Sequence, residues 1–139
     1  MNWKLIFQLS LFGLAMAFAT VFFVPSKVEP LLWLAIFVVC AYLIARGASG
    51  KAFVHGLLLG IVNSLWITAV HILLMDAYLA HHPQEAAMMQ SVKMPAPPRV
   101  MMAIVGPCIG IVSGIVIGLL AMLADGILRR RSRPAAGVS

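Results

Sequence analysis

The side chains that could do chemistry are few, and several of them lie inside apolar stretches. His55 and His71 share one uncharged run and are sixteen residues apart, which is about 24 Å along a helix. One metal ion therefore cannot bind both within one chain. Ser64, Thr68 and His71 fall on one helical face. This polar stripe predicts either hydrogen bonds between helices or the lining of a path for protons or small solutes.

A second group of polar residues, His81, His82 and Glu85, lies close to several methionines. Histidine and methionine side chains together can bind a soft ion such as Cu(I). However, Pro83 suits the first position of a short helix, which would leave His81 outside that helix. We therefore prefer a surface helix, from Pro83 to about Val92, that rests on a bilayer. Metal binding by the three polar residues is the lesser alternative.

Enzyme motifs fail when they are tested. The segment from Gly47 to Lys51 lacks the first glycine of a phosphate-binding loop, and Ala52 stands where that loop needs serine or threonine. The segment from Gly110 to Gly114 has its serine one position away from where a nucleophile-elbow motif needs it, and it lies in an apolar run. The sequence therefore predicts neither an enzyme nor a cofactor.

The elements that position these residues follow from composition. Hydrophobic residues make up 63% of the 139 residues, charged residues 10%, and the mean hydropathy is +1.03. A soluble domain has about 45–50% apolar and about 25% charged residues. Apolar runs cover about 5–24, 29–45, 52–75 and 100–124, and about 20 apolar residues cross a bilayer. We expect an all-α integral membrane four-helix bundle forming a single domain over 1–139, with an outer loop at 76–99 and a basic tail at 125–139.

The basic residues indicate lipid as the partner and set the orientation. The net charge is +6, but the basic residues flank apolar runs, which favours the bilayer and its anionic headgroups over nucleic acid. Seven of the ten basic residues lie on the side of the two termini and three lie on the other side, which predicts that both termini are cytoplasmic. The basic residues of the tail are expected to contact headgroups: Arg129, Arg130, Arg131 and Arg133.

Glycines recur every four residues in the last apolar run, at Gly106, Gly110, Gly114 and Gly118. The third run carries a matching series of small residues, in which Gly56 and Gly60 are the glycines. Small residues at this spacing let helix backbones approach closely. We expect the two helices to pack as an antiparallel hairpin of the glycine-zipper type. A glycine-lined pore or a sliding interface is the alternative.

Several segments resemble those of an uncharacterised family: Gly50-Lys51-Ala52-Phe53, the glycines of the third run, the Tyr78–Glu85 loop and the last helix. Its members are small four-span bacterial membrane proteins classed as a domain of unknown function. The resemblance implies four helices and the bacterial inner membrane, and it implies no catalytic residue.

A structural or partner-associating role, with a homo-oligomer formed through the glycine faces, is the expected function. A channel or transporter for ions or small solutes, acting as a homo-oligomer, is the first alternative. Metal binding on the periplasmic side is the second.

Overall fold

The computed structural model describes residues 1–48 and 50–132, which form six helices and no strand. The helices are α1 (Trp3–Phe22), α2 (Glu29–Gly47), α3 (Ala52–Leu73), α4 (Met75–His81), α5 (Pro83–Ser91) and α6 (Pro98–Arg131). Four of them, α1, α2, α3 and α6, are long and apolar enough to cross a membrane. The predicted all-α fold, with four helices long and apolar enough to span a membrane, is therefore confirmed.

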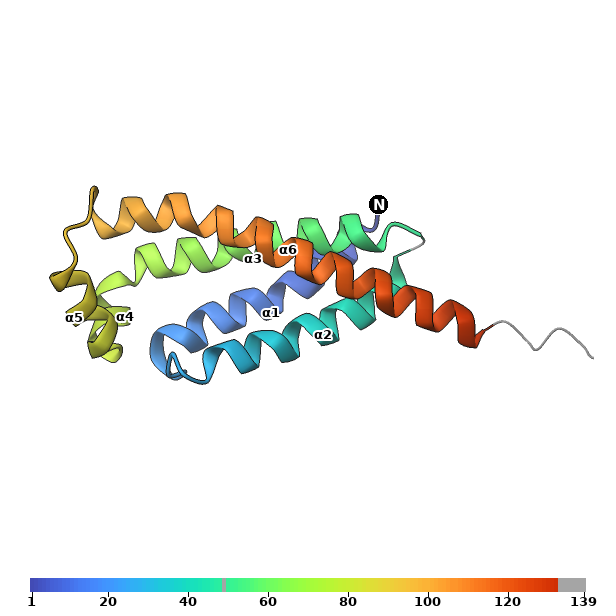
Figure 1. Ribbon diagram of the computed structural model, residues 1–139, viewed down its shortest axis with the longest axis horizontal. Helices are drawn as coiled ribbons and strands as arrows, with labels where there is room; N and C mark the ends of the chain where they lie inside the picture. Colours follow the sequence, from blue (N-terminus) through green and yellow to red (C-terminus); the bar gives the residue numbers. More distant parts are fainter. Residues whose placement is uncertain (49, 133–139) are drawn as a thin grey trace, which may run out of the picture.

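The segment expected as an outer loop is largely helical. Proline at the first position of α5 starts this helix at the expected residue. Helix α4 was not expected, and it follows α3 almost directly, with only Leu74 between them. Together α4 and α5 cover one end of the bundle, called here the capped end (Figure 1). The opposite end, called the tail end, holds Asn2 and the connection between α2 and α3.

Helix α6 is longer than the predicted run. It begins at Pro98, before Val100, and continues to Arg131 through half of the segment expected as a tail. Its 34 residues measure about 51 Å, whereas the hydrocarbon core is about 30 Å thick. The basic end of α6 therefore projects beyond the other helices (Figure 1). Arg133 lies outside the described residues.

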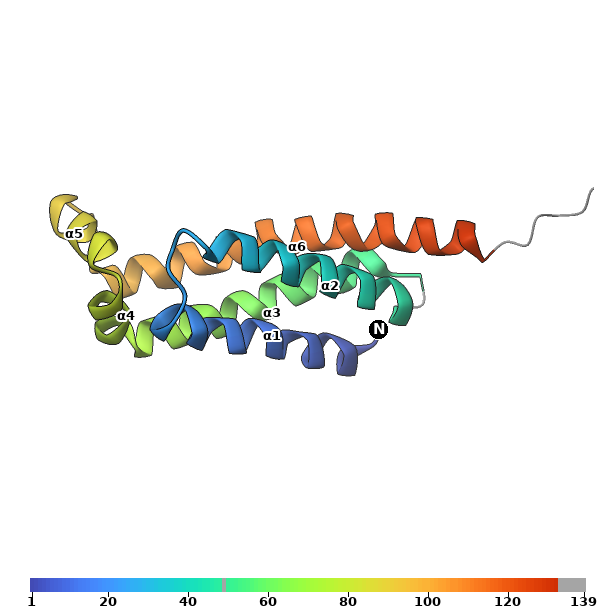
Figure 2. The ribbon, with the colours of Figure 1, turned by 90° about the horizontal axis from the view of Figure 1, so that it is seen from below.

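The four long helices form two layers, with α1 and α3 on one side and α2 and α6 on the other (Figure 2). Helix α3 packs mainly against α6 and α1, and α2 packs mainly against α6. Helix α2 makes few contacts with α1 or α3. The helices therefore follow one another around the bundle in the order α1, α3, α6, α2.

The contact between α3 and α6 is formed by glycine. A methyl group added at Gly56 would overlap the backbone of Gly118, and one added at Gly60 would overlap the backbone of Gly114. Nearer the capped end, a methyl group at Gly110 would overlap the side chain of Ser64. Each step of four residues along α3 is thus matched by a step of four back along α6. The structure places the two small-residue series face to face in an antiparallel pair.

The Thr68 side chain continues this series, because a methyl group added at Gly106 would overlap it. The two small-residue series therefore end in hydroxyl side chains set against glycine at the capped end. At the tail end the two series contact each other through backbone atoms, as Gly56 and Gly118 do.

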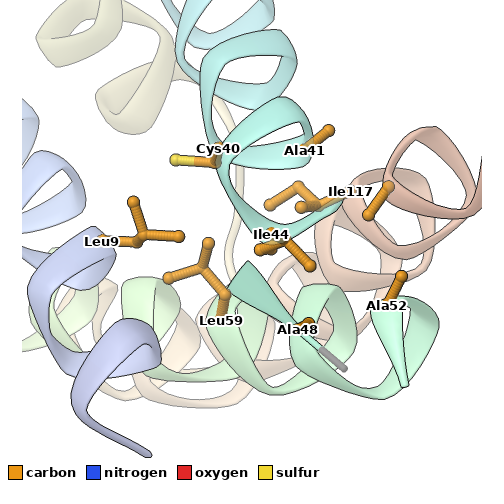
Figure 3. Close-up of a cluster of buried hydrophobic side chains, with 9 residues drawn as sticks. Leu9, Cys40, Ala41, Ile44, Ala48, Ala52, Leu59 and Ile117 are labelled. Carbon is orange, nitrogen blue, oxygen red and sulfur yellow. The ribbon is translucent and has the colours of Figure 1, made fainter. Parts of the chain in front are cut away.

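Helix α2 is fixed mainly at the tail end. Its buried residues are Cys40, Ala41, Ile44 and Ala45, all in its second half. Ile44 meets Leu59 of α3 and Ile117 of α6 in an apolar cluster with no exposed surface on these three side chains (Figure 3). The first half of α2 has no buried residue. This difference leaves space between α2, α3 and α6 toward the capped end.

Replacing Gly60 with alanine tests the close approach of α3 and α6. The added methyl group must displace the backbone of Gly114, so the free energy of unfolding is expected to fall by about 1–3 kcal/mol. A titration with SDS in mixed micelles, followed by circular dichroism, measures this change.

Gly126→Ala on α6 is the matched control, because a methyl group there meets nothing within 4 Å. Alanine favours a helix over glycine by about 0.5–1 kcal/mol, so this variant should be at least as stable as the parent. Equal stability of Gly60→Ala and Gly126→Ala would contradict the contact.

Candidate functional site

Two adjoining cavities lie between α2, α3 and α6 in the half of the bundle near the capped end. Their volumes are about 340 Å³ and about 590 Å³. Both are lined by Glu29, Ser64, Ile67 and Ile109. Pockets of this size suit a small ligand. The shared lining residues make the two cavities one candidate site, called here the α2–α6 site.

The smaller cavity contains the polar stripe predicted on the third helix. Ser64, Thr68 and His71 all line it, so the structure brings the three residues together as their spacing indicated. Tyr78 of α4 closes the end of this cavity, and burial raises the pKa of its phenol. The apolar lining includes four methionines from α5, α6 and the segment between them: Met89, Met94, Met101 and Met102.

The larger cavity runs deeper between the helices and is more aromatic. Trp33 and Phe37 of α2 form one wall, with their ring centroids 5.9 Å apart. Asn63 of α3 and Ser113 of α6 contribute polar groups. Ile117, which belongs to the apolar cluster of the tail end, also lines this cavity. The packed core and the α2–α6 site are therefore continuous.

Glu29 stands where α2 begins and lines both cavities. A negative side chain is favourable there, because the first turn of a helix carries partial positive charge. The indole N–H of Trp33, one turn later, donates a hydrogen bond of 3.1 Å to Glu29 Oε1. Glu29 forms no ion pair with any other described residue. The site thus has a carboxylate that is held by an indole and faces no cation.

The polar side chains of α3 differ in how their hydrogen bonds are satisfied. Ser64 donates to the Ile61 carbonyl at 2.8 Å, as serines in helices commonly do. His71 Nδ1 lies 2.8 Å from the Ile67 carbonyl and its Nε2 lies 3.4 Å from the Thr20 hydroxyl of α1. These contacts join the stripe to α1 and fix the plane of the His71 ring.

Two other polar groups on α3 have no hydrogen-bond partner among the described residues. They are the hydroxyl of Thr68, which lies against Gly106, and both amide atoms of Asn63, which lies against Gly13 of α1. Unpaired buried polar groups cost about 1–3 kcal/mol each. Both residues also line the α2–α6 site.

Sequence reasoning missed Glu29 and Trp33, and it grouped the methionines with His81 and His82 as possible soft-ion ligands instead of placing them in a cavity. A signal for the first two was present, because a carboxylate and an indole four residues apart share one helix face. The methionines come from α5, α6 and the segment between them, and only the folded chain gathers them. Polar residues outside the α2–α6 site form hydrogen bonds elsewhere in the bundle. Ser10, fully buried on α1, accepts a hydrogen bond from Trp66 at 3.3 Å.

His55 lies at the tail end, away from the α2–α6 site. Its Nε2 accepts a hydrogen bond of 3.0 Å from the Asn2 backbone, and its Nδ1 lies 2.8 Å from the Lys51 carbonyl. This histidine therefore ties the start of α1 to the start of α3. The predicted separation of His55 from His71 agrees with these positions at opposite ends of α3.

His81, His82 and Glu85 do not form the metal site considered from the sequence. No group of three or more histidine, cysteine, aspartate or glutamate residues within 1–48 and 50–132 could hold a metal ion. His82 is buried, and its two ring nitrogens lie 2.9 Å from the Tyr78 carbonyl and 3.1 Å from the Val24 carbonyl. Glu85 accepts a hydrogen bond from the Ser26 hydroxyl. These side chains fasten α4 and α5 to the α1–α2 connection instead.

The basic end of α6 forms the ion pair that its spacing predicts. Arg129 Nε lies 2.9 Å from Asp125 Oδ1, which relieves the charge of the acid near the end of the spanning segment. On the capped end, Arg99 and Asp76 form an exposed pair at 3.5 Å. Exposed pairs of this kind contribute about 0–1 kcal/mol.

The Ser26–Glu85 contact is testable by titration. The hydrogen bond from Ser26 holds the pKa of Glu85 below its usual range, so the contact is complete above that range and is lost as pH falls through the lowered pKa. In Ser26→Ala the pKa of Glu85 should rise toward its ordinary value. NMR of ¹³C-labelled glutamate carboxyl groups across acidic pH measures it.

Ser91→Ala is the control for this titration, because Ser91 donates only to the Met88 carbonyl of its own helix. Its Glu85 pKa should equal that of the parent. An unchanged Glu85 pKa in Ser26→Ala would show that the hydrogen bond does not form.

Comparison with known proteins adds no relative from which a function could be carried over. No family model matches the chain, and no curated protein or solved structure matches it. The resemblance to a family of four-span bacterial proteins therefore stays a prediction.

Proposed function

We propose that this multi-pass protein lies in the bacterial inner membrane with both termini in the cytoplasm and binds a small amphipathic molecule in the α2–α6 site. The observation that carries the proposal is the pair of adjoining cavities, of about 340 and 590 Å³, which share Glu29 and Ser64. Apolar walls with a few fixed polar groups are typical of ligand sites.

The shape of the site favours an amphipathic ligand. Its titratable groups, Glu29, His71 and Tyr78, lie toward the capped end. Further along α6 the lining includes Ile109 and Ile117, and its polar residues there, Asn63 and Ser113, are uncharged. Ile109 is 58% exposed. Since it also lines both cavities, the site opens sideways. A molecule could therefore enter from the lipid with its polar group toward the capped end.

The proposed orientation follows from the basic residues. Seven of ten lie at the tail end or in the tail, and they include Arg46, Lys51 and the arginines that end α6. An excess of lysine and arginine favours the cytoplasmic side. The capped end and the polar part of the site would then face the periplasm. The arginines of the tail would contact anionic headgroups.

The other expected functions have less support. The glycines of α3 and α6 contact one another within the chain, so association of copies through these faces would require the hairpin to separate. A channel would need a path to the tail end, where Ile44, Leu59 and Ile117 fill the space between the helices with no exposed surface. Partner association through other surfaces remains the second candidate, because α2 is mostly unburied.

Cysteine accessibility tests the orientation, after Cys40 and Cys108 have been replaced by alanine. In whole cells with a permeabilised outer membrane, a membrane-impermeant maleimide should label Ser91→Cys at the capped end. Ser132→Cys at the tail end should react only after the inner membrane is opened. The reverse labelling pattern would place the termini in the periplasm and contradict the proposal.

Filling the site with a larger side chain tests binding. In lipid nanodiscs, a photoactivatable long-chain alcohol should label peptides that contain Ile67 and Ile109, and an excess of unlabelled alcohol should suppress this labelling. Ile109→Trp places an indole in both cavities, so labelling should fall by at least about tenfold, equivalent to about 1.4 kcal/mol of binding free energy.

Val112→Trp is the matched control. Val112 lies on the same helix, is 63% exposed and lines neither cavity, so its labelling should equal that of the parent. Labelling that never saturates and is equal along all lipid-facing positions would mean that the alcohol samples only the bilayer.

A further inference from the structure

The charge of the α2–α6 site is opposite to that of the protein. The chain carries ten basic and four acidic residues. Yet among the described residues the lining of both cavities includes one carboxylate, Glu29, and no lysine or arginine. The nearest histidine, His71, turns its ring nitrogens to the Ile67 carbonyl and to Thr20. With a neutral histidine, the lining has one negative charge.

The Glu29 carboxylate is also incompletely satisfied. Trp33 donates to Oε1, and no described residue forms an ion pair with either oxygen. Glu29 is half-buried and faces mostly apolar walls. A charge withdrawn from water without a partner is unfavourable, so a cation bound beside Glu29 would relieve that cost.

The walls around the carboxylate suit a cation that is itself apolar. Trp33 and Phe37 line the larger cavity and Tyr78 lines the smaller one, and Glu29 lines both. The faces of aromatic rings attract cations, most strongly where water is excluded. The methionines of the smaller cavity provide polarizable, adaptable surface. No fixed donor array that would recognise a phosphate or sulfate is present in this lining.

From this combination we infer that the ligand of the α2–α6 site is a lipophilic cation, an ammonium or phosphonium centre carrying apolar groups. The inference rests on the proposed binding function and specifies its ligand class. Glu29 neutralises the positive centre, Trp33 and Tyr78 contact its charged face, and Ile67 and Ile109 contact its apolar groups. An anion of the same shape is repelled by the negative charge of Glu29 and does not bind.

Two tetraphenyl ions of nearly equal shape and opposite charge test this assignment. Full-length protein in dodecyl maltoside micelles is titrated by calorimetry with tetraphenylphosphonium and, separately, with tetraphenylborate, and heats from empty micelles are subtracted. Saturable binding of the phosphonium and none, or at least about tenfold weaker binding, of the borate is expected. Equal affinity of the parent protein for both ions would overturn the inference, and this comparison needs no variant.

Glu29→Gln removes the charge and keeps an oxygen that can accept the Trp33 hydrogen bond. Its affinity for tetraphenylphosphonium should fall at least about tenfold. Asp76→Asn is the matched control, because it removes one charge on the same end of the molecule but lines neither cavity. Its affinity should stay at the parent level. Unchanged affinity in Glu29→Gln, or an equal loss in Asp76→Asn, would also overturn the inference.

The outcomes separate this inference from the function on which it rests. Saturable labelling by the neutral alcohol together with equal affinity for the two ions would leave the binding function intact and remove its charge preference. Absence of saturable binding by the alcohol and by both ions would overturn the function and the inference together. Displacement of the phosphonium by added phosphatidylethanolamine would identify a lipid ammonium group as the source of the cation, and no displacement would identify a free cation.

Discussion

Backbone contact between α3 and α6 is the constraint on which the rest of the structure depends. In lipid, helices gain little from hiding apolar side chains from one another, because lipid tails are equally apolar. Close approach of the backbones is then a principal source of attraction. At Gly56 and Gly60 the two chains approach so closely that a methyl group would overlap the facing helix. This contact fixes the α3–α6 pair, and the other helices are added to it.

The α2–α6 site is a consequence of how α2 is added. Its second half packs through Ile44 into the apolar cluster of the tail end, whereas its first half has no buried residue. The small residues of α3 and α6 also leave little side-chain volume to fill the remaining space. Glu29 and Trp33 therefore stand opposite Ser64 and Ile67 across a cavity instead of a packed interface. The glycines that let α3 and α6 approach each other thus leave α2 separated from them toward the capped end.

Much of the fold could be predicted from the sequence, because membrane-spanning helices depend on length and apolarity, which are local properties. The four spans and the start of α5 at Pro83 followed from such local signals. Helix α4 was missed because it continues from α3 without a proline or glycine to separate them. The continuation of α6 to Arg131 could not be predicted from hydropathy, because the basic run that ends this helix has the composition of a tail.

The candidate site could be predicted only in part, for a physical reason. Ser64, Thr68 and His71 lie on one face of one helix, so their periodicity was enough to group them. Glu29 belongs to α2 and the methionines to α5, α6 and the segment between them, so their meeting with the stripe depends on how these elements pack against α3. His81 and His82 are adjacent in sequence, but Ala77 and Tyr78 carbonyls hold their ring nitrogens separately. Proximity along the chain was therefore a poor guide to metal binding.

The four-residue repeat has one more consequence, which concerns register. A slip of α6 by four residues, about 6 Å, would set Gly110 against Gly60 and Gly106 against Ser64, so small residues would still meet small residues. Only the contacts at the ends of the two small-residue series would change, with Thr68 facing Met102 in place of Gly106. The repeat by itself is thus degenerate and does not choose between the two alignments. That choice falls to the short helices between α3 and α6, which His82 and Glu85 fasten to the α1–α2 connection.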